Sequence, residues 1–207
     1  MRYSTRLYAI YHWLAQLLPK IKWSNKYAIT AEDKNLLAEK LASGYYIILV
    51  VTKTHLSSYI VSFLSWIKTG NWATYSHVLM NCDNITDPSN RTGFKFVEAM
   101  SHGVTFSTFD EVFACDNVCL LSPRYIKNDE WNAVIDKLTS EVGCPYDDLF
   151  DLSDATHLSC VEVVLNALKM ADYRTEFVNL DTMITSVGNL VPQMFRECSD
   201  FKVELEK

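Results

Sequence analysis

A cysteine stands where a polar segment meets an apolar helical run in THLSCVEVVLNAL, residues 156–168. Ser159 is a good helix N-cap and Glu162 follows three residues later, as in a capping box. This pattern predicts that Cys160 is the first residue of a helix. The free N–H groups and the dipole of a helix N-terminus favour the thiolate, which is the nucleophilic form. The same groups could stabilise an oxyanion once the thiolate attacks a carbonyl.

A nucleophilic cysteine also needs a base, and the base needs an orienting partner. His77 lies in TYSHVLMN and Glu98 in FKFVEAM, two segments that both read as strands. If these strands pair as a long hairpin, the imidazole and the carboxylate can share one face. There are plainer alternatives: Cys160 could be a small buried core residue, and His77 and Glu98 could be ordinary residues of a half-solvated sheet.

The elements that would position these residues follow from local patterns. Helices are predicted over residues 5–18, 30–43, 55–70 and 129–143 and after Ser159, and strands over residues 45–51, 74–81, 94–100, 103–109 and 118–123. The tail from Asn179 is predicted to be irregular or weakly helical. This order of elements is typical of an α+β domain with a mostly antiparallel sheet packed against helices.

Composition indicates one globular domain with an extension. The chain has 207 residues, of which 49% are apolar, and no Gly/Ser-rich or Pro-rich linker divides it. We expect an N-terminal helical extension over residues 1–42 and the globular domain over residues 43–207. The net charge is −6, and the first 26 residues hold five bases and no acid, so the remainder is strongly acidic. An acidic body argues against general nucleic-acid binding.

The N-terminus and the cysteines bear on the compartment. The apolar run LYAIYHWLAQLL holds a His and a Gln and has no cleavage site after it, and it is shorter than the about 20 residues that span a bilayer. We therefore expect six reduced cysteines in a cytoplasmic protein, or in host cytoplasm for a phage-encoded enzyme. The basic, aromatic helix at residues 5–18 could make a peripheral membrane contact, or pack on its own domain or a partner subunit.

Five segments in order resemble a known family. SGYYIILV, YSHVLMN, FKFVEAMSHGVTFSTFDEVF, VGCPYDDLF and HLSCVEVVLNAL together resemble the permuted NlpC-type papain-like cysteine hydrolases of the YiiX/YaeF-like group. The resemblance covers roughly residues 43–170. It implies a permuted papain-like fold in which Cys160 is the nucleophile, His77 the general base and Glu98 the orienting residue.

The same resemblance implies a substrate class. It predicts a cysteine peptidase or amidase that acts through an acyl-enzyme on peptide or peptidoglycan-like amide bonds, with ester or amide bonds of acyl lipids as the alternative. His157, close to Cys160 in sequence, could compete as base or bind substrate, and we name Tyr146 of the PYD segment as a second candidate substrate-binding residue. The family's usual CSE is CVE here, and VLMN replaces VGI after the histidine. A catalytically inactive member that binds a membrane or a partner is the other class considered.

Metal binding is the weakest alternative. Cys115 and Cys119 are four residues apart, but no second Cys/His pair has the spacing of a zinc site. The sequence contains neither a P-loop nor a GxGxxG motif. We therefore expect no metal and no cofactor.

Overall fold

The computed structural model describes residues 27–53, 58–59, 61–62, 66, 72–83, 85–147, 156–171 and 192–207. The helix predicted over residues 5–18 lies outside these ranges, as does most of the one predicted over residues 55–70. None of the helices within the described ranges is both long and apolar enough to cross a bilayer.

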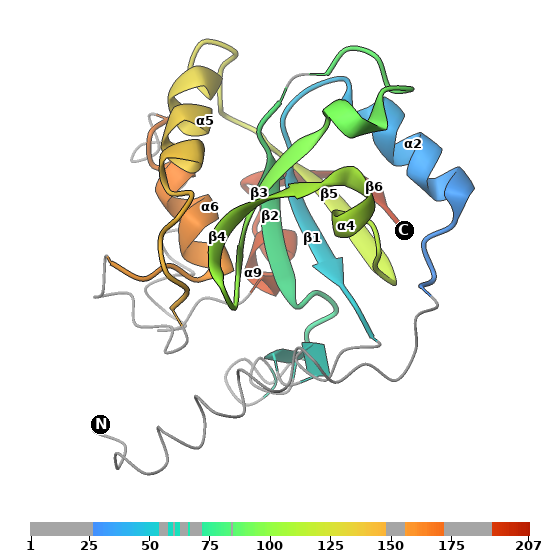
Figure 1. The fold of residues 1–207 in the computed structure, drawn as a ribbon, viewed down its shortest axis with the longest axis horizontal. Helices are drawn as coiled ribbons and strands as arrows, with labels where there is room; N and C mark the ends of the chain where they lie inside the picture. Colours follow the sequence, from blue (N-terminus) through green and yellow to red (C-terminus); the bar gives the residue numbers. More distant parts are fainter. Residues whose placement is uncertain are drawn as a thin grey trace.

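A six-stranded sheet forms the centre of the molecule (Figure 1), with the strand order β4-β3-β2-β1-β5-β6. Every neighbouring pair of strands is antiparallel. The strands are β1 (Ile47–Val51), β2 (His77–Asn81), β3 (Lys95–Met100), β4 (Gly103–Thr108), β5 (Asn117–Pro123) and β6 (Phe201–Glu206). The helices are α2 (Ala31–Leu41), α4 (Phe109–Val112), α5 (Trp131–Ser140), α6 (Cys160–Leu168) and α9 (Gln193–Glu197), with a 3₁₀ turn, η2, at Arg91–Gly93.

Helices cover both faces of this sheet. Apolar residues of α5, α6 and α9 form one buried cluster with Ile47 and Leu49 of β1. Apolar residues of α2 and α4 form a second cluster with Ile48 and Val50 of the same strand. Successive residues of a strand point to opposite faces, so β1 needs apolar residues at every position. This arrangement explains its continuous apolar run and confirms the α+β class with an antiparallel sheet.

Helix α2 begins and ends as its sequence predicts. Thr30 is the N-cap and forms a reciprocal capping box with Asp33. The helix ends before Gly44, whose N–H donates to the carbonyl of Leu41. Leu37 and Leu41 are buried in the cluster that α2 shares with the sheet. The predicted domain boundary after residue 42 stays a prediction. Helix α2 precedes that boundary in the sequence and packs on the sheet.

The prediction of an irregular or weakly helical C-terminal tail was wrong for its last segment, whereas the short helix α9 agrees with it. Residues Phe201–Glu206 form β6, which pairs with β5 at the edge of the sheet, and α9 precedes it. The strand has only three apolar residues, alternating with charged ones, and its backbone hydrogen bonds depend on β5. Such a short segment is stabilised by its partner strand rather than by local propensity. The sequence reasoning also missed α4.

The turn between β3 and β4 depends on a glycine. Gly103 has a φ of 113°, and a Cβ at this position would lie 2.7 Å from the carbonyl oxygen of Cys144. That carbonyl accepts a hydrogen bond of 2.8 Å from the N–H of Val104, which holds β4 against the segment after α5. The backbone conformation and the close approach therefore both require the absence of a side chain.

Replacing Gly103 with alanine should lower the free energy of unfolding by about 1–3 kcal/mol, the typical cost of a strained backbone conformation. Urea denaturation followed by circular dichroism measures this loss. Gly44→Ala is the matched control, because no atom lies within 4 Å of a Cβ built there. Equal stability of the two variants would contradict the role assigned to Gly103.

Candidate active site

Two adjacent strands bring His77 and Glu98 together. The ladder between β2 and β3 pairs Met80 with Val97, so the alternation of side chains places His77 and Glu98 on one face of the sheet. The Nε2 atom of His77 lies 2.7 Å from an Oε2 atom of Glu98. Their side chains are 20% and 10% exposed, respectively. The hairpin expected from the sequence therefore forms, and it produces an imidazole–carboxylate pair.

A third residue, Ser107, completes this hydrogen-bond chain. Its hydroxyl donates to Oε1 of Glu98, the carboxylate oxygen that does not face His77. In the ladder between β3 and β4, Glu98 pairs with Thr105, so Ser107 is its diagonal neighbour on the same face. The sequence reasoning missed Ser107. The sequence offered one signal: Ser107 carries a hydroxyl two positions after Thr105, the residue opposite Glu98. Recognising this signal required knowing how β3 and β4 pair.

These hydrogen bonds keep Glu98 ionised. Burial alone would raise the pKa of the carboxyl, but the hydrogen bond and the charge of His77, with the hydroxyl of Ser107, outweigh it and lower the pKa below its ordinary value of 4.5. Glu98 is thus a carboxylate that can orient the imidazole and stabilise its protonated form.

Cys160 is the first residue of α6, as its sequence context predicts. The Ser159 side chain accepts a hydrogen bond from the N–H of Glu162, and the Glu162 carboxylate accepts one of 2.8 Å from the N–H of Ser159. Cys160 is 5% exposed and belongs to the apolar cluster between α6 and the sheet. Helix α6 packs on β2 and β3, the strands that carry His77 and Glu98. The thiol is therefore both packed and at a helix N-terminus, where a thiolate is favoured.

His77 interacts with Cys160 as well as with Glu98. Burial would lower the pKa of the imidazole, but the charge and hydrogen bond of Cys160, together with those of Glu98, raise it to about 10. Because Nε2 is engaged by Glu98, Nδ1 is the ring nitrogen left for the sulfur. The raised pKa favours a protonated imidazole at neutral pH, beside the Glu98 carboxylate.

The other buried cysteines lie in different surroundings. Burial raises the pKa of Cys82, Cys115, Cys119 and Cys198 to about 12 each, which keeps these thiols protonated at neutral pH. Cys115 and Cys119 also belong to two different clusters, on opposite faces of the sheet. Their arrangement therefore gives no support to the zinc alternative.

The two candidate substrate-binding residues flank the start of α6. Tyr146 is half-buried and forms an isolated parallel bridge with Leu158, two residues before Cys160. His157 is exposed, and its Nδ1 lies 3.0 Å from the Thr156 hydroxyl. The PYD segment thus runs beside the residues that lead into α6. Whether Tyr146 and His157 bind substrate stays a prediction.

Comparison with known proteins supports the fold. No protein-family model matches the chain, and no curated protein sequence shows significant similarity to it. The structure is similar to the crystal structure of YiiX from Escherichia coli O157:H7, with a TM-score of 0.56 and 15% sequence identity. The match covers 78% of this chain and 96% of YiiX. The likeness to YiiX predicted from the sequence is confirmed at the level of the fold.

YiiX is described as a metalloprotein. Within the ranges that the structure of this chain describes, no three His, Cys, Asp or Glu residues are grouped so that they could hold a metal ion. The residues of the candidate site do not fit a metal centre either, since His77 is engaged by Glu98 through Nε2 and by Cys160.

Proposed function

We propose that the protein is a cysteine hydrolase of the permuted papain-like, NlpC-type fold, which cleaves amide bonds of peptides or peptidoglycan-like fragments. The observation that carries the proposal is the hydrogen-bonded pair of His77 and Glu98, whose imidazole is also influenced by Cys160 at the start of α6. A thiol, an imidazole and a carboxylate in that order are the parts of a nucleophile–base–orienter site.

The first half of the reaction follows from the placement of these groups. The Cys160 thiolate attacks the scissile carbonyl, and the free N–H groups at the start of α6 stabilise the oxyanion that forms. The protonated imidazole of His77 then gives its proton to the leaving amine, which leaves a thioester on Cys160. Glu98 holds the ring in place throughout and stabilises its charged form.

The second half regenerates the enzyme. Neutral His77 accepts a proton from a water molecule as that water attacks the thioester carbonyl. The carboxylic acid product leaves, and the sulfur departs as a thiolate next to the protonated imidazole. The proton that His77 gives to the leaving amine in the first half-reaction is therefore regained from water in the second.

Alkylation with iodoacetamide tests the state of the nucleophile. At neutral pH, Cys160 should be labelled fastest of the six cysteines, because a thiolate next to a protonated imidazole is the reactive form. The variant His77→Ala should slow this labelling about tenfold at pH 7, where an ordinary thiol is only a few per cent ionised. Peptide mapping by mass spectrometry identifies the adduct. Preferential labelling of another cysteine, or unchanged labelling in the variant, would count against the proposal.

A further inference from the structure

The segment that leads into His77 lies outside the sheet. We call residues 73–76 the lead-in segment, since they directly precede His77, the first residue of β2. His77 pairs with Val50 of β1, whereas the ladder between β2 and β3 covers Met80 and Asn81. The end of an element opens more readily than its centre. The position of His77 therefore depends on what holds the lead-in segment.

Helix α9 accepts two backbone hydrogen bonds from the lead-in segment. The side-chain oxygen of Gln193 accepts one of 3.1 Å from the N–H of Thr74 and one of 3.3 Å from the N–H of Tyr75. The side-chain nitrogen of Gln193 donates to Glu197, one turn later in α9, which fixes the orientation of the amide. A single side chain thus satisfies two consecutive N–H groups outside the sheet.

The Tyr75 side chain ties the lead-in segment to β6. Tyr75 is 1% exposed and belongs to the same buried cluster as Cys160. Its hydroxyl donates a hydrogen bond of 2.7 Å to the carboxylate of Glu206. Burial and this hydrogen bond raise the pKa of the Tyr75 hydroxyl well above its ordinary value, so the hydroxyl stays protonated and remains the donor. The ring is therefore held by packing along its length and by a hydrogen bond at its tip.

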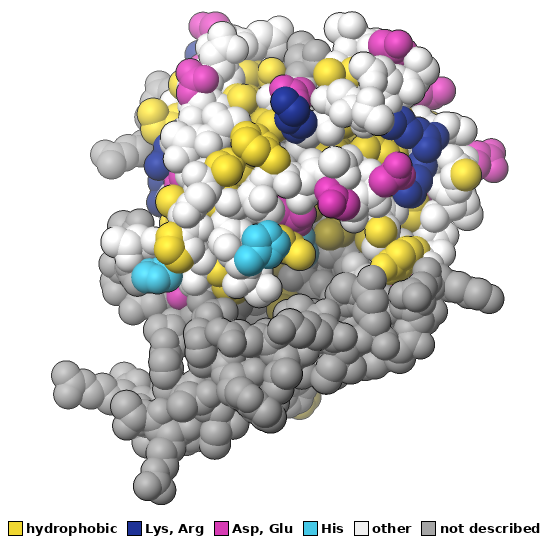
Figure 2. All heavy atoms as spheres, viewed as in Figure 1, with side chains coloured by type: hydrophobic (Ala, Val, Ile, Leu, Met, Phe, Trp, Pro, Cys, Tyr) yellow, Lys and Arg dark blue, Asp and Glu magenta, His cyan; other side chains and the backbone are white. Residues whose placement is uncertain are grey.

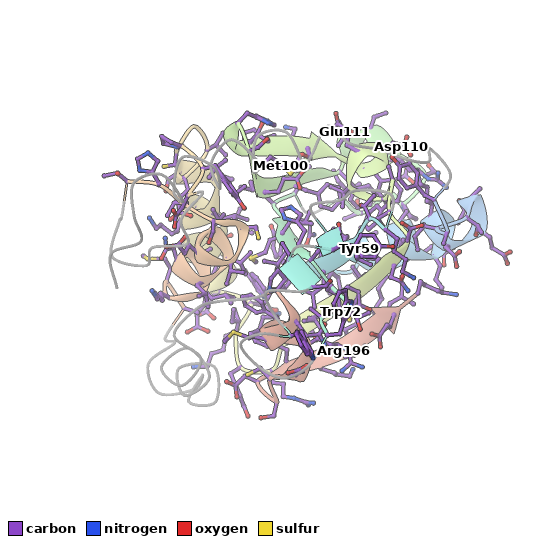
Figure 3. All side chains as sticks on the ribbon, turned by 90° about the horizontal axis from the view of Figure 1, so that it is seen from below. Tyr59, Trp72, Met100, Asp110, Glu111 and Arg196 are labelled. Atoms are coloured by element: carbon purple, nitrogen blue, oxygen red, sulfur yellow. The ribbon has the colours of Figure 1, made fainter. Side chains whose placement is uncertain are left out.

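Arg196 of α9 keeps Glu206 in place as the acceptor. The Nε and Nη2 atoms of Arg196 donate to the two carboxylate oxygens of Glu206, at 3.2 and 3.0 Å. This hydrogen bonding is the main reason that the pKa of Glu206 lies below its ordinary value, so Glu206 is ionised at neutral pH. Figure 3 shows Arg196 in the same part of the molecule as Trp72, the residue before the lead-in segment. Helix α9 and strand β6 thus form one support for this segment.

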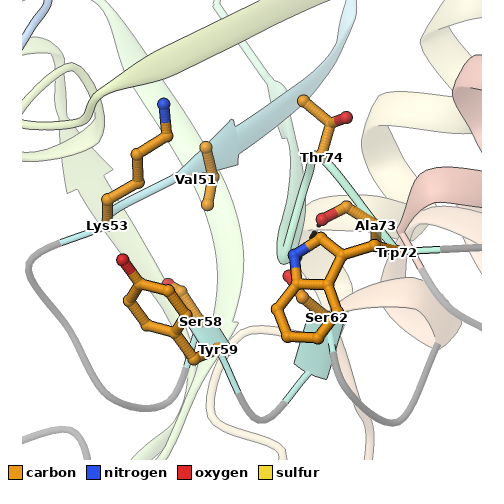
Figure 4. Close-up of a pocket in the computed structure, with 8 residues that line it drawn as sticks. All are labelled: Val51, Lys53, Ser58, Tyr59, Ser62, Trp72, Ala73 and Thr74. Atoms are coloured by element: carbon orange, nitrogen blue, oxygen red, sulfur yellow. Dashed lines mark hydrogen bonds between the residues drawn. The ribbon is translucent and has the colours of Figure 1, made fainter. Parts of the chain in front are cut away.

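The two outer residues of the lead-in segment are held as well. The Ser62 hydroxyl donates a hydrogen bond of 2.9 Å to the carbonyl of Ala73, drawn as a dashed line in Figure 4. The N–H of Ser76 donates one of 3.1 Å to the carbonyl of Val50, and its hydroxyl donates one of 3.0 Å to Ser58. Every residue of the lead-in segment therefore forms at least one hydrogen bond that restrains it.

We infer that Tyr75 and Gln193 are positioning residues, which fix the backbone at His77 so that its ring stays aligned with Glu98 and near Cys160. The inference rests on the proposed hydrolase function, because it assigns the support of the general base. A displacement of about 1 Å in a catalytic group can cost about 10²-fold in rate. A partly released lead-in segment should therefore slow the chemical step and leave substrate affinity unchanged. The C-terminal part of the chain contributes to catalysis in this way, through His77 and not through substrate contact.

The protonation of His77 reports on this alignment. Burial lowers the pKa of the imidazole, and Cys160 and Glu98 raise it to about 10. On the face seen in Figure 2, acidic and basic side chains are interspersed, so distant charges on it largely offset one another at the ring. A ring that moves away from Cys160 and Glu98 should therefore lose its proton at a lower pH.

Substitutions in the two supports test the inference. Gln193→Leu removes the acceptor of two backbone N–H groups, and Tyr75→Phe removes the hydroxyl alone. Each should lower kcat on a cleaved peptide by about tenfold and leave KM within about twofold of the wild type. Glu206→Gln keeps an acceptor for the Tyr75 hydroxyl and should retain most of the activity. Ser122→Ala is the matched control, because Ser122 donates a similar hydrogen bond of 2.8 Å to Glu204 of β6 and should leave kcat unchanged.

NMR titration of the His77 ring separates failure of this inference from failure of the hydrolase proposal, since it needs no substrate. The pKa of His77 should fall from about 10 towards its ordinary value of 6.5 in Gln193→Leu and in Tyr75→Phe, and it should stay in place in Ser122→Ala. That result supports the inference even if the wild-type protein cleaves no peptide. An unchanged His77 titration in Gln193→Leu and Tyr75→Phe, a rise in KM alone, or an equal loss of kcat in Ser122→Ala would overturn it.

Discussion

Replacing Cys160 with alanine should reduce hydrolysis of a cleaved peptide by about 10⁴-fold or more, as removal of the nucleophile does in other enzymes of this kind. The reason is that the acyl-enzyme cannot form without the sulfur, while His77 and the helix N-terminus are left in place. Steady-state turnover of a peptide and stem-peptide panel measures the loss. The substitution removes one atom from a residue that is 5% exposed, so the fold should be retained.

Cys144→Ala is the matched control for this variant. Cys144 is half-buried, and its contribution to the fold described above comes from its backbone carbonyl, which alanine keeps. Turnover by this variant should stay within about twofold of the wild type. Thermal unfolding of both variants shows whether either has lost its fold. Residual turnover in Cys160→Ala close to that of Cys144→Ala would mean that Cys160 is a core residue and not the nucleophile.

The helix start at Cys160 could be predicted because its determinants are local. A capping box needs only Ser159 and Glu162, and the structure forms it as the sequence indicates. The same holds for α2, where Thr30 and Asp33 define the first turn. Strand β1 was readable for a related reason, since a strand buried on both faces is apolar at every position.

The contact between His77 and Glu98 needed one further assumption. Each residue lies on a segment with a clear strand pattern, but their meeting depends on the two strands being neighbours in the sheet. Ser107 required a third strand and its register, because its role comes from a diagonal position opposite Glu98. The sequence could therefore predict Cys160, His77 and Glu98 as site residues, but not Ser107. Predicting Ser107 would have required knowing both how β2 pairs with β3 and how β3 pairs with β4.

Strand β6 could not be predicted from the residues that form it. Strand β6 is stabilised by hydrogen bonds to β5, its neighbour in the sheet but distant in the sequence. Features that arise from contacts between distant segments carry little local signal.

Replacing Glu98 with glutamine should lower kcat/KM by about 10²- to 10⁴-fold, as loss of the orienting carboxylate does in comparable triads. A neutral amide cannot stabilise the protonated imidazole, so the pKa of His77, raised to about 10 in the wild type, should fall. Activity that needs the protonated ring should therefore be lost at a lower pH in the variant. The pH dependence of kcat/KM on a cleaved peptide measures both effects.

The pH dependence of the free energy of unfolding gives an independent test of the interaction between His77 and Glu98. The lowered pKa of Glu98 contributes stability above the ordinary value of 4.5, and this contribution is lost as the pH falls through the folded-state pKa. The raised pKa of His77 contributes stability below 6.5, and this contribution is lost as the pH rises towards about 10. The difference in unfolding free energy between wild type and Glu98→Gln should thus be largest between pH 4.5 and 6.5.

Ser107→Ala separates orientation from charge in this chain of hydrogen bonds. It removes one neutral donor to Glu98 and keeps the carboxylate, so kcat/KM should fall by about tenfold at most, and the alkaline limit of the pH profile should move less than in Glu98→Gln. The loss of kcat/KM should be larger for Glu98→Gln than for Ser107→Ala. The carboxylate is charged and contacts the His77 ring directly, whereas the hydroxyl of Ser107 acts only through Glu98. A Glu98→Gln enzyme with wild-type turnover and an unshifted pH profile would show that Glu98 only packs the sheet, and His77 would then have to act as the base without an orienting partner.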